Sequence, residues 1–539
     1  MKVLSFNQPF KYIFWTVGLF FFNTINGQTF TLRDSLQGGL RKERTCFDVQ
    51  HYRLQVQVNI EEKYLKGSNQ ITFRVVEPTQ KIQLDLFANM QIDSLLWGQQ
   101  SLPYQRIHDA FFVDFPAKLS EGETHQITCY YQGSPLEAKN APWDGGFVWK
   151  KDSNGKPFVG VAVQGTGASL WYPVKDHQSD EPDFGADILV SVPNDLVNVS
   201  NGTLVAVKEL PNQYREWHWN VSYPINTYNI VLNIGDYVLI EDAYQDLTLH
   251  YYVLRENEDI ARKQFEEVHP MMTCFYDKFG PYPFAKDTYK LIETPYLGME
   301  HQSAVAYGNR YRKGYLGRDI SGTGIGMAFD YILIHETAHE WFGNSITSKD
   351  IADMWIHESF TTYAETVYVE CTQGYEAAKK YIFGQSKMVA NKNPMIGVFG
   401  VNAKPKSSDH YYKGALMLHT LRHTFAKDDD WWKTLKLFTE TFAYQIIESK
   451  EVVDFFQNHT DWNLVPFFEQ YLQHPEIPKL QLRENKNRWE VFFTSNVENF
   501  QMPIFLEIDG VSKRVLVGKK PIKIKAKTVN FPENVYYVK

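Results

Sequence analysis

The feature that most constrains this chain of 539 residues is a pair of histidines, His335 and His339, with Glu336 between them. Residues at positions i and i+4 project from one face of a helix, so the two imidazoles can bind one metal ion while Glu336 stays beside it. Apolar residues before the motif predict a helix over 326–342, and Gly343 predicts its end. The fold must therefore bring a third ligand to this helix.

Glu358 is the candidate for that third ligand. It lies near the start of a second predicted helix, 353–371, which Asp350 or Asp353 can cap. An antiparallel return of the chain after a short polar loop would bring Glu358 toward His339. Two histidines and one glutamate leave zinc a fourth position for water or substrate, which is typical of a catalytic site and not of a structural one. The sequence thus predicts a hydrolytic centre with one Zn²⁺ per chain.

Two more acidic residues lie close to the motif. Glu340 directly follows His339, and we interpret it as a solvated helix residue. Glu365 lies two helical turns beyond Glu358 and could face either the site or solvent. Neither is predicted to bind the metal.

The period of the hydrophobic residues predicts a multidomain α+β protein. Residues 28–245 alternate apolar and polar side chains, as at 52–60, and predict a mostly antiparallel β domain. From about residue 260 the period is helical, which predicts a mainly helical domain over 246–475 with strands near its start. After Pro475 alternation returns, with a hairpin turn at Asp509 and Gly510, which predicts a small β domain over 476–539. The predicted helices span 258–278, 326–342, 353–371, 374–391, 412–425, 431–444 and 449–457.

Charge and cysteine content exclude some functions and leave others open. The net charge is -8 and no run of Lys and Arg is concentrated enough to neutralise a phosphate backbone, so nucleic acid is not an expected partner. The cysteines have no C-x-x-C spacing and could form two bridges, one or none. They are Cys46, Cys129, Cys274 and Cys371.

Residues 1–27 are interpreted as a signal peptide. Lys2 and Lys11 precede an apolar run over 12–22, and Gly27 offers a small residue before the cleavage point. The run is shorter than the roughly 20 apolar residues that span a bilayer. We therefore expect a secreted, periplasmic or extracellular protein with no stable membrane span, and retention of the segment as an anchor is the alternative.

The zinc motif and its neighbours resemble the aminopeptidase N family, which includes leukotriene hydrolase. The resemblance rests on HETAHEWFGN and on the eighteen residues between His339 and Glu358, which lies in WIHESFTTYAE. Upstream, residues 297–301 are similar to the family motif Gly-x-Met-Glu-Asn, with Leu297 in place of Gly and His301 in place of Asn. Downstream, residues 411–414 resemble the family motif Tyr-x-Lys-Gly.

These motifs imply roles for particular residues. Glu336 would be the general base, and Tyr411, not Tyr412, the tyrosine that stabilises the oxyanion. Glu300 would bind the free α-amine of the substrate, and the preceding residues of its motif would also contact the substrate. Gln164, ahead of WYPVKDHQSDEP, is similar to a position where family members place a substrate-facing Gln or Glu. The implied substrate-binding set is Gln164, Gly298, Met299 and Glu300.

The resemblance also implies an architecture: a saddle-like N-terminal β domain, a thermolysin-like catalytic domain and a small C-terminal β-sandwich. Roughly 180 residues follow Glu358. That length leaves no room for the large helical fourth domain that encloses the active site in many relatives, so we expect a more open cleft.

The implied function is a zinc-dependent aminopeptidase that acts on peptides with a free N-terminus. Two alternatives remain open. The substitutions at Leu297 and His301 leave room for a zinc endopeptidase, and a non-catalytic zinc-containing peptide-binding protein is the third interpretation, against which the intact Glu336 and Tyr411 count. Epoxide hydrolysis is known among relatives, but no residue demands it. The sequence does not indicate the preferred first side chain or the oligomeric state.

Overall fold

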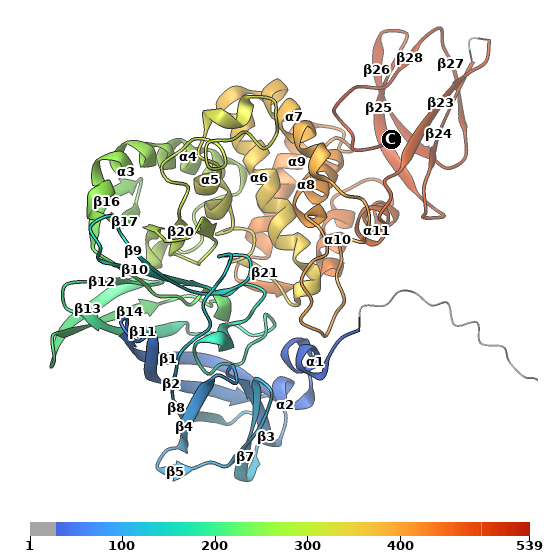
Figure 1. Cartoon of the computed structure of the whole chain (residues 1–539). Helices are drawn as coiled ribbons and strands as arrows, with labels where there is room; N and C mark the ends of the chain where they lie inside the picture. Colours follow the sequence, from blue (N-terminus) through green and yellow to red (C-terminus); the bar gives the residue numbers. More distant parts are fainter. Residues whose placement is uncertain (1–28, 487) are drawn as a thin grey trace, which may run out of the picture.

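The computed structural model describes residues 29–486 and 488–539, which form an N-terminal β part, a central part rich in helices and a small C-terminal β part (Figure 1). The predicted signal peptide, 1–27, lies outside the described residues. Within the described ranges, no helix has the length and apolar character needed to cross a membrane. The multidomain α+β architecture predicted from the sequence is confirmed.

The N-terminal part is built on an eight-stranded sheet that follows the predicted alternation. Tyr52 of β1 pairs with Ile71 of β2, and the apolar side chains of β1 point into the core. One neighbouring pair, β1 with β11, is parallel, so the sheet is not wholly antiparallel. The strand order is β13 (Thr203–Leu210), β14 (Tyr214–Val221), β11 (Ala186–Pro193), β1 (Phe47–Asn59), β2 (Tyr64–Val75), β8 (Thr124–Gly133), β4 (Met90–Trp97) and β5 (Gln100–Ser101).

Two smaller sheets and two short helices complete this part. The helices α1 (Leu32–Gly38) and α2 (Lys42–Thr45) were not predicted, although Thr31 and Asp34 form a capping box at the start of α1. The smaller sheets have the orders β3 (Thr79–Asp85), β7 (Ala110–Leu119), β6 (Tyr104–Ile107), and β12 (Val197–Val199), β15 (Asn233–Gly235), β10 (Pro157–Ala162), β9 (Gly146–Lys151).

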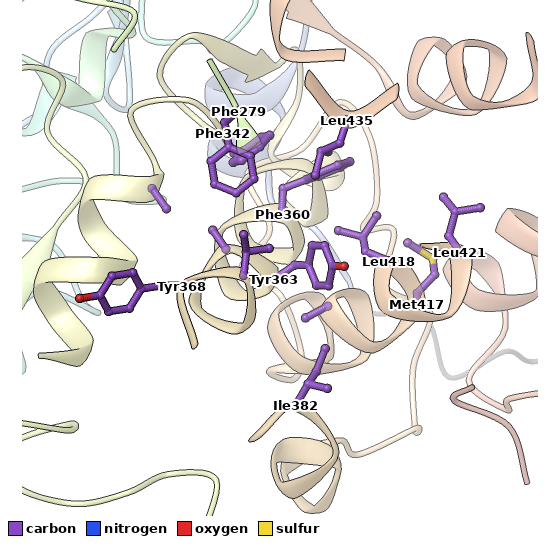
Figure 2. Packing of buried hydrophobic residues seen from close by; sticks show 14 of the residues in the cluster. Phe279, Phe342, Phe360, Tyr363, Tyr368, Ile382, Met417, Leu418, Leu421 and Leu435 are labelled. Atoms are coloured by element: carbon purple, nitrogen blue, oxygen red, sulfur yellow. The ribbon is translucent and has the colours of Figure 1, made fainter. Parts of the chain in front are cut away.

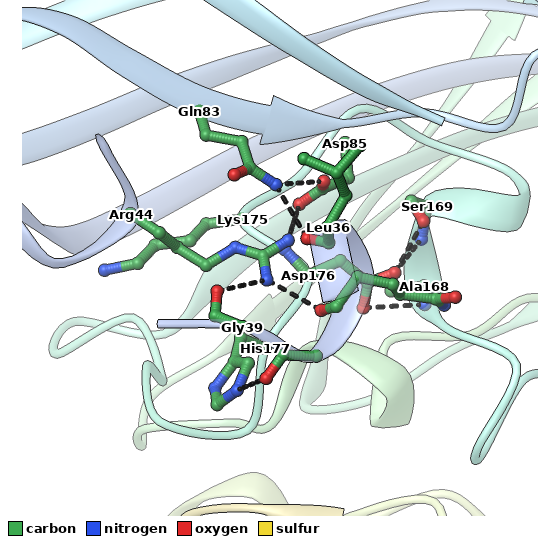
Figure 3. A network of polar contacts seen from close by, with 12 residues as sticks. Leu36, Gly39, Arg44, Gln83, Asp85, Ala168, Ser169, Lys175, Asp176 and His177 are labelled. Carbon is green, nitrogen blue, oxygen red and sulfur yellow. Dashed lines mark hydrogen bonds and ion pairs between the residues drawn. The ribbon is translucent and has the colours of Figure 1, made fainter. Parts of the chain in front are cut away.

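A buried polar network fixes the loop after β10 (Figure 3). Arg44 pairs with Asp85 at 2.6 Å, and the Asp85 carboxylate also accepts from the backbone N–H of Asp176. The Asp176 side chain then accepts hydrogen bonds from the backbone N–H groups of Ala168 and Ser169. Because both charges of the ion pair are buried and hydrogen-bonded, the network holds the segment that begins at Gln164 in one conformation.

The central part begins with a five-stranded sheet in the order β16 (Tyr237–Tyr244), β17 (Leu247–Leu254), β18 (Tyr289–Glu293), β20 (Val305–Tyr307) and β19 (Gly298–Met299). Strand β19 lies at an edge of this sheet. A domain boundary at residue 245 would separate β16 from β17, which pair antiparallel along their whole length. One sheet therefore contains strands from both sides of the predicted boundary.

Helices follow in the order that the sequence predicts, with shifted ends. The helix of the histidine motif, α5 (Tyr331–Ala338), is shorter than predicted because the chain turns after its C-cap, His339. The helix α11 (Val465–Gln473) was not predicted. The others are α3 (Glu258–Gln264), α4 (Val268–Lys278), α6 (Trp355–Gln373), α7 (Tyr375–Gly384), α8 (Asp409–Arg422), α9 (Asp428–Thr441) and α10 (Ser449–Asn458).

Aromatic packing around α6 forms the centre of the helical core (Figure 2). Phe360 of α6 stacks on Phe342 at a ring-centroid distance of 5.2 Å and on Phe438 at 5.1 Å. Phe342 in turn packs edge-on against Phe279 at 5.1 Å. These contacts join α4, α6, α9 and the chain that leaves α5, so the position of α6 relative to α5 is set by buried rings.

The C-terminal part consists of two three-stranded sheets that face each other as a small sandwich (Figure 1). The predicted hairpin is confirmed: Ile508 pairs with Val511, and Asp509 and Gly510 between them both have positive φ, as a tight two-residue turn requires. Among residues 488–539 no helical domain follows. The sheets are β23 (Lys479–Glu484), β24 (Arg488–Thr494), β27 (Ile522–Lys525) and β26 (Val511–Gly518), β25 (Gln501–Ile508), β28 (Val529–Asn530).

Of the pairings that the sequence left open, the structure contains one disulfide, Cys274–Cys371, across a sequence separation of 97 residues. It joins α4 to the end of α6. Cys46 and Cys129 are buried free thiols. The disulfide thus reinforces the same helices that the aromatic core joins.

Reduction with dithiothreitol should lower the Tm of the wild-type protein by several degrees, because opening a loop of this length typically costs about 2–5 kcal/mol. The variant C274A/C371A should have the lower Tm from the outset and show no further shift with dithiothreitol. C46A/C129A is the matched control and should keep the sensitivity to dithiothreitol. Differential scanning calorimetry checks this, and equal shifts in both double variants would contradict it.

Candidate active site

The three predicted metal ligands converge at the end of α5 and the start of α6. His335 lies on α5, His339 is its C-cap, and Glu358 is in the first turn of α6. The Oε2 atom of Glu358 lies 3.7 Å from His335 Nε2 and 3.5 Å from His339 Nε2. Asp350 caps the short turn Ile351–Asp353 that leads into α6. The helix α6 itself begins after Met354 without a side-chain cap, so neither Asp350 nor Asp353 caps it as predicted. All three ligand side chains are buried.

In each imidazole the Nδ1 atom forms a hydrogen bond that orients the Nε2 atom toward Glu358. His335 Nδ1 donates to Glu365 Oε1 at 2.7 Å, and His339 Nδ1 donates to the carbonyl oxygen of Phe342 at 2.9 Å. Glu365 is itself held, since its other oxygen accepts from Tyr381 at 2.8 Å and from Gln385 at 3.1 Å. Glu365 therefore faces the site, which resolves the alternative that the sequence left open.

The donor set fits a zinc ion. Among the described residues, Oε2 of Glu358 is buried without a hydrogen-bond donor, although Oε1 accepts from Tyr411. A buried carboxylate oxygen left unpaired is costly, and a cation between it and the two Nε2 atoms would remove that cost. Two imidazoles and one carboxylate are the ligands of a zinc site that keeps one position open.

Glu336 lies beside the ligands, next to strand β19. Its burial raises the pKa of its carboxyl to about 7, although the neighbouring His335 and His339 act in the opposite direction. Gly298 of β19 packs directly against it, because a Cβ at this position would lie 2.9 Å from Glu336 Oε1 and 2.7 Å from Ile332 Cγ2. The glycine is required for the edge strand to approach the motif helix this closely.

Glu300 is placed at one end of the same site and is 2% exposed. Its Oε1 atom accepts from the Tyr228 hydroxyl at 3.0 Å and from the side-chain amide of Gln164. Its backbone carbonyl accepts from Asn344 Nδ2 at 2.7 Å. The structure thus brings Gln164 and Glu300 together, 136 residues apart in the sequence.

Tyr411, not Tyr412, reaches the ligands. Its hydroxyl donates to Glu358 Oε1 at 2.9 Å, and its ring stacks on that of His335. Gly414, one turn later, lets α8 pack closely on α6, because a Cβ there would meet Ser359 Oγ at 1.7 Å. The glycine of the Tyr-x-Lys-Gly motif therefore positions the helix that carries Tyr411.

These residues line one cavity of about 480 Å³. Its walls include all three ligands, Glu336, and the residues predicted to contact substrate, Gln164, Gly298, Met299, Glu300 and Tyr411. A cavity of this volume suits a ligand of a few residues in length, since pockets of about 300–1,000 Å³ are typical of such sites.

Two family models match this chain: the peptidase family M1 N-terminal domain over residues 48–229 and the peptidase family M1 domain over 263–471. The second range contains the three ligands, Glu300, Glu336 and Tyr411. The chain belongs to peptidase family M1. Family membership and the donor set together imply zinc as the cofactor of this M1 protein.

Similar proteins are distant in sequence. The leucyl aminopeptidase of Saccharolobus solfataricus is 20% identical over 417 residues, which cover 70% of this chain and 51% of that protein. Aminopeptidase B of Mus musculus is 24% identical over 319 residues, 56% of this chain and 46% of that protein. The M1 chain described here spans about half the length of the curated relatives it matches.

Solved structures share the fold. An M1 zinc metallopeptidase from Deinococcus radiodurans has a TM-score of 0.66 at 22% identity, and the match covers 82% of this chain and 95% of that one. A mutant of that enzyme bound to a Tyr-Ser-Ala substrate has a TM-score of 0.65 at 22% identity, with 80% and 94% covered.

The interpretation of Glu340 in this M1 protein was wrong, and one residue near Glu300 was missed. Glu340 is not solvated: it is 0% exposed, and it accepts from the Tyr282 hydroxyl at 3.0 Å and from the backbone N–H of Ser303 at 2.9 Å. The chain turns after His339, which carries Glu340 inward. Tyr228, the partner of Glu300, had no local motif that would have marked it.

His301, which stands where the family has Asn, is also buried, and neither ring nitrogen has a hydrogen-bond partner among the described residues. Burial lowers its pKa to about 3, so the ring stays neutral at ordinary pH. A neutral ring at position 301 provides no positive charge next to the Glu300 carboxylate.

Replacing Glu365 by Ala should weaken zinc affinity about 10–100-fold, because His335 loses the partner that orients it. Competition with a chromophoric chelator measures this. The matched control is E376A, whose side chain is 70% exposed and on the neighbouring helix. If E365A and the wild type bind zinc equally well, Glu365 does not act through His335.

Proposed function

We propose that this M1 protein is a zinc-dependent aminopeptidase that releases N-terminal residues from peptides. The observation that carries the proposal is Glu300, a buried carboxylate at one end of the cavity that also contains the zinc ligands. Among the described residues, the hydrogen bonds to its carboxylate come from two neutral donors, Tyr228 and Gln164. A substrate ammonium would provide the missing positive charge, and a blocked amine would not.

His335, His339 and Glu358 would hold the zinc ion. When bound, zinc supplies a Lewis acid that polarises a carbonyl group and lowers the pKa of water toward ~7. Glu336 accepts a proton from the attacking water and later delivers it to the leaving amine, work that typically contributes roughly 10²–10⁴ in rate. Its position beside Gly298 puts this carboxylate next to the edge strand along which a substrate would lie.

Tyr411 donates a hydrogen bond to the oxygen of the scissile carbonyl as negative charge develops there. Without substrate its hydroxyl donates to Glu358, and it would exchange that acceptor for the carbonyl oxygen. A preorganised donor of this kind is commonly worth about 3 kcal/mol in the transition state. The ring stack on His335 limits how far the tyrosine moves.

Peptides are the proposed substrates because the relatives are named aminopeptidases and a fold neighbour binds Tyr-Ser-Ala. We propose, in addition, that the protein acts outside the cytoplasm. The apolar run ahead of Gly27 supports this, and so does the Cys274–Cys371 disulfide, since disulfides persist mainly in oxidising compartments.

A panel of aminoacyl chromogenic amides tests the activity and the role of Glu336. The wild type should hydrolyse some of the panel and lose that activity with a zinc chelator. E336Q should keep its zinc and lose about 10²–10⁴-fold in kcat, because the general base is gone while all three ligands remain. E376Q is the control. Undiminished turnover by E336Q would contradict the mechanism, and a zinc-loaded wild type inert on the whole panel would favour the peptide-binding alternative.

Paired peptides with free and N-acetylated amines test Glu300. The wild type should cleave only the free peptide, and E300A should lose most of this discrimination through a higher KM, because the amine no longer meets a carboxylate. Liquid chromatography with mass detection identifies which bond is cut. Equal cleavage of free and acetylated peptides by the wild type, or internal cuts, would point to the endopeptidase alternative.

A further inference from the structure

The edge strand β19 gives a bound peptide a direction. Gly298 and Met299 pair with β20 on one side only, and their other side lines the active-site cavity. A peptide whose amine meets Glu300 and which adds to this edge antiparallel to it would run from Glu300 past Met299 and Gly298 toward Leu297. At about 3.3–3.4 Å per residue, its third or fourth residue reaches Leu297.

A second cavity, of about 600 Å³, begins where the first one ends. Leu297 and Trp143 line both cavities. From there the second cavity continues along Tyr296, Pro295 and Thr294, the residues that precede β19. A peptide that follows the edge strand therefore passes between Leu297 and the largely exposed Trp143 into this cavity.

Four basic side chains line the second cavity, in a protein whose net charge is -8. Lys150 donates to the carbonyl oxygen of Pro295 at 2.7 Å. The other three form no ion pair or side-chain hydrogen bond with the residues that the structure describes. They are Lys139, Lys151 and Arg310. The nearby Asp236 is paired with Lys156 and Arg255 instead.

The carboxylates of the second cavity already have partners. Glu293 accepts from the backbone N–H of Leu254, from Asn257 and from the Tyr311 hydroxyl. Asp152 accepts from two backbone N–H groups of its own turn, and Glu256 binds the same turn through Ser153 and Asn154. These carboxylates are thus held by neutral donors, and none of them forms an ion pair with Lys139, Lys151 or Arg310. Among the described residues that line this cavity, four basic side chains outnumber three acidic ones.

We propose that the second cavity binds the downstream part of an extended peptide substrate, from about its fourth residue, and that Lys139, Lys151 and Arg310 select acidic side chains there. The inference rests on the proposed function, because Glu300 fixes where the peptide begins. It adds a substrate class: peptides longer than three residues with Asp or Glu after the third position.

Hexapeptide amides test the proposal. All share an N-terminal residue cleaved well as a chromogenic amide, followed by two alanines, and end in three Asp, three Ala or three Lys; the amide cap removes the terminal carboxylate. The value of kcat/KM should be about threefold to tenfold higher for the Asp peptide than for the Lys peptide, as expected for a few partly exposed ion pairs. Raising NaCl from about 0.05 M to about 0.5 M should shrink this ratio, because salt screens exposed charges.

Charge reversal locates the effect. K151E/R310E should invert the preference to the Lys peptide and leave the hydrolysis of the aminoacyl amide unchanged. K118E/K208E is the matched control, since it makes the same change in net charge at two exposed lysines of the N-terminal sheets that do not line either cavity. K139E/K151E is a second charge-reversal variant of the same cavity, and it keeps Arg310, whose backbone has a positive φ.

Several outcomes would overturn the proposal. One is equal kcat/KM for the three hexapeptides. Another is no gain in kcat/KM from the tripeptide amide with the same N-terminal residue and two alanines to the hexapeptide amide that ends in three Ala. The last is an unchanged preference in both charge-reversal variants. None of these outcomes contradicts the proposed aminopeptidase activity, which would be contradicted by a wild type that hydrolyses no aminoacyl amide. A wild type that hydrolyses aminoacyl amides but does not distinguish the peptide tails would contradict only the proposed role of the second cavity.

Discussion

The site depends on how the end of α5 is packed against the start of α6. Two of the ligands lie at the end of α5 and the third lies at the start of α6. A small shift between these helices would separate ligand atoms that lie 3.5–3.7 Å apart. Phe342 and Phe360, one from each side of this junction, stack at 5.2 Å inside the aromatic core. Removing such rings from a core typically costs about 3–5 kcal/mol, so the packing that stabilises the fold also holds the ligand geometry.

Around the ligands, polar groups are fixed in turn by other buried groups. Glu365 orients His335 and is itself held by Tyr381 and Gln385. Gly298 and Gly414 act by their lack of a side chain, since each lets one backbone approach where a Cβ would clash. The side chains around the ligands are therefore held in place by the surrounding fold.

Features with a local signal were predictable from the sequence. The histidines follow from the spacing on one helix, Glu358 from a short capped connection, and the Asp509–Gly510 hairpin from turn chemistry. Glu340 was misjudged because every residue of α5 is buried and the chain turns directly after it, so the usual solvent-facing side of a helix does not exist here. The short helix α11 was missed although Pro466, in its first turn, is a helix-start signal that the sequence contains.

Tyr228 and Gln164 have no such local signal, because their position next to Glu300 depends on contacts between distant parts of the chain. The three ligands all lie within residues 335–358, whereas the two side chains that donate to the Glu300 carboxylate come from the N-terminal part. Several hydrogen bonds hold the segment 300–303 there: Asn201 donates to the carbonyl of Gln302, and Ser303 accepts from the backbone N–H of Gly202. The metal centre is thus a property of two neighbouring helices, while the pocket that would select a free amine is a property of the domain interface. In the proposed aminopeptidase, a change at that interface should alter which peptides are cut before it alters zinc binding.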